Sequence, residues 1–192
     1  MSAKNQSYEK ILKAATQLFH LQGYHATGLN QILQESGAPK GSLYYHFPNG
    51  KEQLAFEVIQ LSGQTIAADI QLRLTAFDNP IEAFEQNIQA IVDRFDDFDK
   101  MPDFASLPLG LLAAEMALVN ENLRQACEDT FMMWEGLYID KLLAGGYSEK
   151  QARLISNSMN ALIEGGIMLC LTTKSTEPLA KIKKMIPLLL SK

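Results

Sequence analysis

The spacing of the apolar residues constrains the fold of this chain more than any other feature of its sequence. Apolar residues recur every three or four positions almost throughout the 192 residues, and the alternation typical of strands is scarce. This period places apolar side chains on one face of an α-helix, so the sequence predicts an all-α protein of about nine helices. Caps, prolines and glycines predict helices over residues 6–22, between 27 and 36, from 39, 51–75, from 80, 107–119, 121–144, 148–173 and from 178, with a loop at 96–106.

The composition excludes several classes of protein. With 47% hydrophobic residues, 12 Gly and 7 Pro, the chain is too apolar and too varied for low-complexity disorder. A chain of this length buries roughly 70% of its unfolded surface, so its stability requires neither a disulfide nor a structural metal. Cys127 and Cys170 are isolated, and the three histidines lack the spacing of metal ligands, so we predict no metal and no cofactor.

No segment of the sequence predicts export or membrane insertion. Residues 1–13 are polar and lack the apolar core of a signal peptide. The longest apolar stretch, residues 104–119, is interrupted by Pro108 and Glu115 and falls short of a membrane span. We therefore expect a soluble cytoplasmic protein without a membrane partner, in which a buried Glu115 carboxylate would need a partner of its own.

Residues 27–47 combine two short helical segments with a tight turn between them. The turn is formed by residues 36–38, and Gly37 supplies the positive φ that lets two helices cross sharply. Ile32 and Leu43 are placed to pack inward against the first helix. Helix, three-residue turn and helix is the layout of a helix-turn-helix, whose second helix enters the major groove of DNA.

The residues on the outer face of the second segment suit contact with double-stranded DNA. Lysine can donate to guanine, serine to several bases, and proline or tyrosine can touch a thymine methyl group. Hydroxyl groups, imidazole and the positive N-terminus of a helix suit phosphates. Residues 1–50 also carry a charge of +2, against −7 for residues 51–192. We predict DNA contacts from Thr27, Gly28, Pro39, Lys40, Gly41, Ser42, Tyr44, Tyr45, His46 and Lys51.

The same segment resembles the DNA-binding domain of the tetracycline-repressor (TetR) type of transcriptional regulators. The resemblance extends over residues 6–56 and rests above all on residues 41–47, which read Gly-Ser-Leu-Tyr-Tyr-His-Phe. Most members have two residues between that phenylalanine and the next lysine, whereas this chain has three, at 48–50. The insertion resembles the LmrA/YxaF branch of the family, as do residues 108–115 and 123–134, so the likeness spans nearly the whole chain.

The resemblance implies a homodimer that binds a palindromic operator, represses nearby genes and is released by a small molecule. It divides the chain into a DNA-binding domain at residues 1–50, continuing to about 65, and an effector-binding and dimerisation domain at residues 51–192. Two recognition helices in successive major grooves would require half-sites roughly 34–36 Å apart.

The apolar residues of the C-terminal part admit two interpretations. They are ordinary core, or they line an adaptable pocket for a small apolar or amphipathic effector. The pocket candidates are Phe84, Phe95, Met116, Phe131, Met133, Trp134 and Met159. The last two helices likewise either pack internally or, as the resemblance implies, form a four-helix interface with a second subunit. The interface candidates are Ala152, Ile155, Met159, Leu162, Ile163, Gly166, Ile167, Cys170, Leu179, Ile182, Ile186 and Leu189.

Other classes of function have less support in the sequence. No nucleophile motif and no phosphate-binding loop is present, so we do not expect an enzyme. Two alternatives to the repressor remain open. One is a ligand-independent activator or regulator, and the other is a dimeric small-molecule binder that has lost specific DNA binding.

Overall fold

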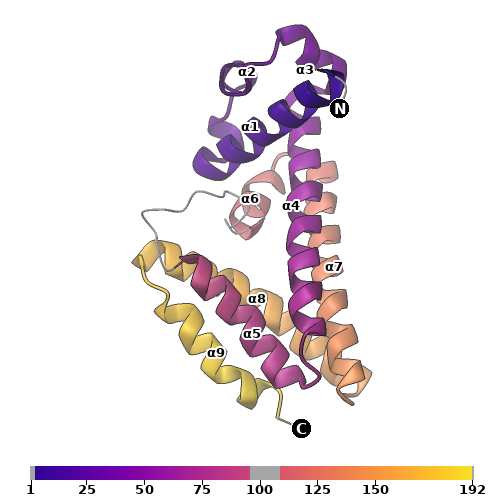
Figure 1. Ribbon diagram of the computed structural model, residues 1–192, viewed down its shortest axis with the longest axis vertical. Helices are drawn as coiled ribbons and strands as arrows, with labels where there is room; N and C mark the ends of the chain where they lie inside the picture. Colours follow the sequence, from indigo (N-terminus) through magenta and orange to yellow (C-terminus); the bar gives the residue numbers. More distant parts are fainter. Residues whose placement is uncertain (1–2, 96–108, 192) are drawn as a thin grey trace. The chain divides into compact units, whose positions relative to one another are not determined.

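Nine α-helices make up the residues that the computed structural model describes, 3–95 and 109–191, and these residues contain no strand. The predicted all-α fold with an N-terminal helix-turn-helix is therefore confirmed. The loop expected at 96–106 lies outside the described residues, as does the start of the helix expected at 107–119. The helices, labelled in Figure 1, are α1 (Ala3–Ala26), α2 (Leu29–Ser36), α3 (Lys40–His46), α4 (Gly50–Thr75), α5 (Pro80–Phe95), α6 (Leu109–Met116), α7 (Glu121–Ala144), α8 (Glu149–Thr173) and α9 (Glu177–Leu189).

The chain forms two compact units. The first consists of Met1–Gly63 and Leu109–Glu128, and the second consists of Gln64–Pro108 and Asp129–Lys192. Helices α4 and α7 each contribute residues to both units, whereas α6 belongs to the first and packs against α1. The segment Leu109–Glu128, which the resemblance places in the effector-binding and dimerisation domain, belongs by its packing to the first unit.

The first unit is held together by a small apolar core. Ile11 and Phe19 of α1, Ile32 of α2 and Leu43 of α3 are all buried, as is Phe47 directly after α3. Helices as short as α2 and α3 are not stable in isolation. Each buried side chain of this size contributes about 1.5–3 kcal/mol, so packing against α1 holds both short helices in place.

Helix α1 is kinked at Gly23, where φ is 84° and ψ is 169°. The sequence predicted a helix over residues 6–22 ended by this glycine, and the helical conformation is indeed broken there. A positive φ interrupts the helical hydrogen bonds at little cost for glycine. The chain then resumes a helical turn that ends at Ala26.

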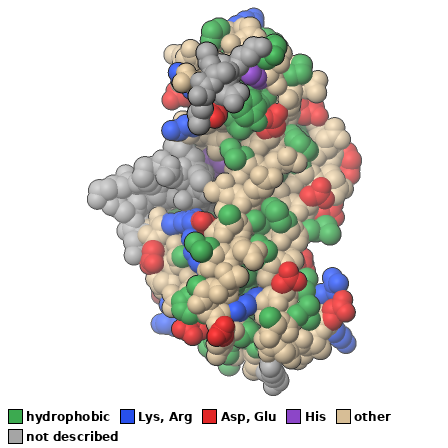
Figure 2. All heavy atoms as spheres, turned by 45° about the vertical axis from the view of Figure 1, so that its right-hand side comes forward, with side chains coloured by type: hydrophobic (Ala, Val, Ile, Leu, Met, Phe, Trp, Pro, Cys, Tyr) green, Lys and Arg blue, Asp and Glu red, His purple; other side chains and the backbone are tan. Residues whose placement is uncertain are grey.

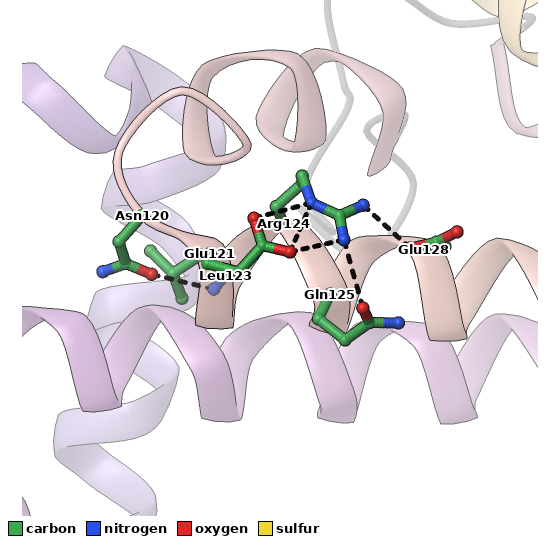
Figure 3. Close-up of polar contacts among 6 residues, drawn as sticks. All are labelled: Asn120, Glu121, Leu123, Arg124, Gln125 and Glu128. Atoms are coloured by element: carbon green, nitrogen blue, oxygen red, sulfur yellow. Dashed lines mark hydrogen bonds and ion pairs between the residues drawn. The ribbon is translucent and has the colours of Figure 1, made fainter.

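The start of α7 is stabilised by polar contacts within the first unit (Figure 3). The Asn120 side chain accepts a hydrogen bond of 2.9 Å from the Leu123 N–H and so caps the helix. The Arg124 guanidinium donates to Glu121 one turn before it and, at 2.8 Å, to Glu128 one turn after it. Exposed pairs of this kind contribute little to stability individually, so the cap and the buried residues fix this end of the helix.

Helix α9 lies along α5 and α8 in the second unit (Figure 1). A Cβ atom added at Gly166 of α8 would lie 2.6 Å from Ile182 Cδ1 and 2.8 Å from Leu179 Cδ2 of α9. The missing side chain therefore lets α8 and α9 approach closely within one subunit.

Helix α8 begins with the capping box that the sequence predicted. The Ser148 hydroxyl accepts a hydrogen bond of 3.3 Å from the Gln151 N–H, and the Gln151 side chain accepts from the Ser148 N–H at 3.1 Å. By length and composition alone, α8 could cross a membrane. One face of α8, including Met159 and Ile163, is buried within the second unit.

Candidate nucleic-acid interface

The turn between α2 and α3 is formed as a helix-turn-helix requires. Gly37 closes α2 in the left-handed conformation, with φ 62° and ψ 15°. No atom lies within 4 Å of a Cβ built at Gly37, so the backbone conformation alone favours glycine here. Pro39 follows with φ −63° in an extended conformation and serves as the N-cap of α3.

Helix α3 is anchored by its inner face and exposed on its outer face. Leu43 and Phe47 are fully buried, and the Tyr8 ring stacks on Phe47 with 5.2 Å between ring centroids. Tyr44 and Tyr45 are 47% and 64% exposed. The outer face also exposes Pro39, Lys40 and Gly41, with Ser42 partly exposed. The structure thus brings these predicted contact residues together on one surface over a rigid support.

His46 lies at the C-terminal end of that surface and is half-buried. Its ring meets Tyr45 edge-on at 5.0 Å and Tyr8 at 5.8 Å, measured between centroids. The Gln53 side chain donates a hydrogen bond of 3.2 Å to the His46 carbonyl. These contacts fix the end of α3 against α1 and α4.

A polar cluster behind α3, formed by Tyr8, Gln53 and Glu57, was not predicted from the sequence. The Tyr8 hydroxyl donates a hydrogen bond to the Glu57 carboxylate, and Gln53 donates to the same carboxylate at 2.9 Å. The hydrogen bond to Glu57, together with burial, raises the pKa of Tyr8 to about 12. The phenolic hydroxyl of Tyr8 is the only feature that hints at a polar partner.

Thr27, predicted with Gly28 to place the start of α2 near phosphate, has a buried side chain. Thr27 is 1% exposed, and its hydroxyl donates a hydrogen bond of 2.7 Å to the Gly23 carbonyl. The side chain therefore closes the turn between α1 and α2. The exposed Gly28, which is the N-cap of α2, presents the start of that helix to solvent.

Lys51, predicted to contact phosphate, packs against the same turn. Its Nζ lies 4.2 Å from the centroid of the Tyr24 ring and 3.5 Å from the His25 carbonyl oxygen. Burial lowers the pKa of Lys51, and the nearby Glu115 carboxylate opposes this shift. The ammonium group is thus half-buried at the turn between α1 and α2.

The residues predicted to line an effector pocket do not form one group. Phe84, Phe95, Trp134 and Met159 are buried in the second unit, while Met116 is buried in the first. In the second unit Phe131 is partly exposed and Met133 is exposed. The sequence analysis missed two buried polar residues of the second unit, Asn87 and Tyr138, and the Tyr138 ring lies 5.4 Å from that of Phe84.

The candidates for the dimer interface differ in their exposure within one subunit. Eight of the twelve are buried in the subunit itself: Ala152, Met159, Ile163, Gly166, Ile167, Cys170, Leu179 and Ile186. Ile155, Leu162, Ile182 and Leu189 are partly exposed.

Other hydrophobic side chains reach the surface of the molecule, as on the face drawn in Figure 2. On α8 the exposed large ones are Leu154, Met168 and Leu169, and on α9 they are Met185 and Leu188. The apolar periodicity of α8 thus continues onto the side of the helix that faces away from its own core.

Comparison with known proteins identifies both parts of the chain. Residues 11–58 match the sequence model described as bacterial regulatory proteins, tetR family. Residues 80–185 match the model described as the C-terminal domain of transcriptional regulators like LmrA and YxaF. Two regulators from Bacillus subtilis (strain 168) are similar over almost their whole length. The uncharacterized HTH-type transcriptional regulator YxaF is 45% identical over 192 residues (100% of this chain, 99% of the relative), and the HTH-type transcriptional regulator LmrA is 48% identical over 186 residues (97% of each).

Solved structures share the fold at low sequence identity. The reduced form of NemR from E. coli superposes with a TM-score of 0.83 at 19% identity, covering 96% of this chain and 98% of that one. A TetR transcriptional regulator from Legionella pneumophila gives a TM-score of 0.79 at 22% identity, covering 96% and 97%. These likenesses concern the arrangement of helices.

Proposed function

Because this chain belongs to the TetR family of bacterial transcriptional regulators, on its LmrA/YxaF-like branch, we propose that it is a homodimeric repressor released from a palindromic operator by a small molecule. Its relatives are DNA-binding regulators and not enzymes. The outer face of α3 supports the proposal most directly. There Lys40, Tyr44 and Tyr45 are exposed above the buried anchors Leu43 and Phe47.

The chemistry of that face suits the major groove. The Lys40 ammonium, at the first turn of α3, can donate to O6 and N7 of guanine. The exposed rings of Tyr44 and Tyr45 can contact thymine methyl groups and donate their hydroxyls to phosphates. Two copies of α3 in successive major grooves would read two half-sites one turn of DNA apart, which requires a two-fold symmetric dimer.

The exposed apolar face of α8 is the surface that we assign to the dimer. Leu154, Ala161, Gly165, Met168 and Leu169 are exposed at intervals that place them along one side of the helix. Small residues at the centre of such a stripe allow two helices to approach closely, while the large ones bury apolar surface. Homodimer interfaces are enriched in apolar area of this kind.

Asn87 supports a small-molecule site within the second unit. It is buried on α5 beside the Tyr138 hydroxyl, and neither its side-chain nitrogen nor its oxygen makes a hydrogen bond of ordinary geometry among the described residues. Burial raises the pKa of the Tyr138 hydroxyl, and the nearby Asn87 amide counteracts this in part. An unpaired buried amide costs roughly 1–3 kcal/mol. A neutral effector with a hydrogen-bond donor and acceptor would satisfy it against the aromatic surface of Phe84 and Tyr138.

Repression by this protein would follow from occupancy of the operator. A dimer bound across two major grooves excludes RNA polymerase from an overlapping promoter, and this function places the protein with the chromosome in the cytoplasm. Effector binding must weaken operator binding by the same factor by which the operator weakens effector binding.

Selection of genomic fragments tests the proposal. Purified protein is mixed with sheared genomic DNA at two salt concentrations, and the bound fragments are sequenced. We expect one palindromic site to remain enriched at the higher salt, and a reporter driven by the adjacent promoter to be silenced by the protein. Activation of that reporter would contradict the repressor role, and salt-sensitive binding without a preferred site would favour a small-molecule binder that has lost specific DNA binding.

A further inference from the structure

The kink in α1 is closed by a side chain from a helix about 90 residues further along the chain. The Glu115 carboxylate of α6 accepts a hydrogen bond of 2.8 Å from the Tyr24 N–H through Oε2. Its other oxygen, Oε1, accepts one of 2.7 Å from the His25 N–H. Both bonds lie within the first unit, and both are charge-assisted, which makes them stronger than bonds between neutral groups.

The kink explains why these two amides need an acceptor. In an unbroken helix they would bond to carbonyls four residues earlier, but the extended ψ of Gly23 turns the chain away from that path. Tyr24 and His25 therefore begin a new turn with free N–H groups, as at any helix N-terminus. A carboxylate is the acceptor best suited to such a pair.

Gly23 and Glu115 fit each other sterically. A Cβ atom at Gly23 would lie 2.5 Å from Glu115 Oε2, closer than van der Waals contact permits. The glycine is therefore required for two reasons, its positive φ of 84° and the close approach of the carboxylate. Any other residue at this position would be strained by the positive φ and would push the Glu115 carboxylate away from the two amides.

The turn that Glu115 holds leads directly into the helix-turn-helix. The Thr27 hydroxyl bonds to the Gly23 carbonyl, and α2 starts two residues later. Lys51 contacts the same turn from α4, above the Tyr24 ring, and Glu115 favours its charged form. Side chains from α4 and α6 thus fix the turn from which α2 and α3 continue.

We propose that Glu115 is a positioning residue for DNA binding, although its sequence segment matches the C-terminal domain of the family. Its carboxylate sets the conformation of residues 23–27 and thereby the orientation of α2 and α3. It contacts no nucleotide, so its contribution to operator affinity is entirely through the backbone of that turn. The N-terminal segment, on this account, is a complete DNA-binding unit only with α6 in place.

Full-length Glu115→Gln and Glu115→Ala proteins test this, with Glu121→Gln as the matched control. Glu121 is an exposed carboxylate of the same unit that forms an ion pair with Arg124 on its own helix. Operator affinity is measured on the enriched genomic duplex, at a temperature where circular dichroism shows each variant fully folded. We expect E115Q, which keeps one acceptor oxygen, to weaken binding about tenfold, E115A to weaken it further, and E121Q to bind normally.

Amide hydrogen exchange distinguishes positioning from a general loss of stability, and it does not depend on an operator. We expect E115Q to accelerate exchange at Tyr24 and His25 while Leu43 and Phe47 remain protected. Gly23→Ala provides a second variant with the same expected pattern. Normal operator affinity in folded E115A, or unchanged exchange at the two amides in E115Q, would overturn the proposal.

Discussion

Lys40 and Lys51 have different surroundings, so we expect them to contribute to DNA binding in different ways. Lys40 is exposed at the first turn of α3. Lys51 is half-buried at the start of α4, with its Nζ over the Tyr24 ring. A side chain that enters the groove specifies sequence, whereas one beside the backbone of DNA strengthens binding to any sequence.

Alanine substitutions should therefore separate the two lysines. We expect Lys40→Ala to relax the preference for the operator over other sequences, because a base contact is lost. We expect Lys51→Ala to weaken binding to all sequences alike and to reduce the salt slope by about one unit. Titrations of operator and scrambled duplexes at several salt concentrations measure both. A uniform loss in K40A with unchanged preference would exclude base contact by Lys40.

Whether the buried Asn87 amide lacks a hydrogen-bond partner can be tested without knowing the effector. We expect Asn87→Leu, which keeps the branched shape of the side chain, to stabilise the effector-free protein by about 1–2 kcal/mol, because an unpaired buried amide is removed. Asn160→Leu is the matched control. Its amide donates a hydrogen bond of 3.2 Å to the Phe131 carbonyl, so this change should destabilise. Chemical denaturation measures both, and equal destabilisation would show that the Asn87 amide is satisfied.

At the scale of elements, local sequence determines where most helices begin but not what they pack against. The Ser148 capping box and the left-handed Gly37 were predictable because the residues responsible are neighbours in the chain. The continuation of α1 past Gly23 was not, because the acceptor for its amides comes from α6. The spacing of apolar residues likewise predicted that α8 is an apolar helix. It could not distinguish the face buried in the subunit from the exposed face, since both carry large hydrophobic residues.

The exposed face of α8 can be tested for a role in dimerisation. Leu154 is 69% exposed on its outer face, and we expect Leu154→Glu to shift the dimer toward monomer, because a charge is costly to bury at an apolar interface. Leu72→Glu is the matched control, since Leu72 is 70% exposed on α4. Sedimentation velocity at several concentrations measures the change. Equal dimer dissociation constants in the two variants would show that the exposed face of α8 is not the dimer interface.

In the whole molecule, segments that are distant in the sequence belong to the same compact unit. The resemblance implied a DNA-binding domain at residues 1–50 that continues to about 65, close to Gly63 where the first compact unit leaves α4, but it did not suggest that this unit also includes Leu109–Glu128. Nothing in the local pattern of α6 shows that it packs on α1, because that contact joins segments about 90 residues apart. The surface of α3 was predictable because one buried residue, Leu43, fixes which side of this seven-residue helix faces inward, but the turn that supports it was not.

The proposed function requires two copies of α3 to bind successive major grooves of one operator. Hydroxyl-radical footprinting of the full-length protein on the enriched genomic site tests it most directly. We predict two symmetric protected regions whose centres lie about 10 base pairs apart, or a multiple of that spacing. A single asymmetric footprint, or uniform protection without periodicity, would contradict the account.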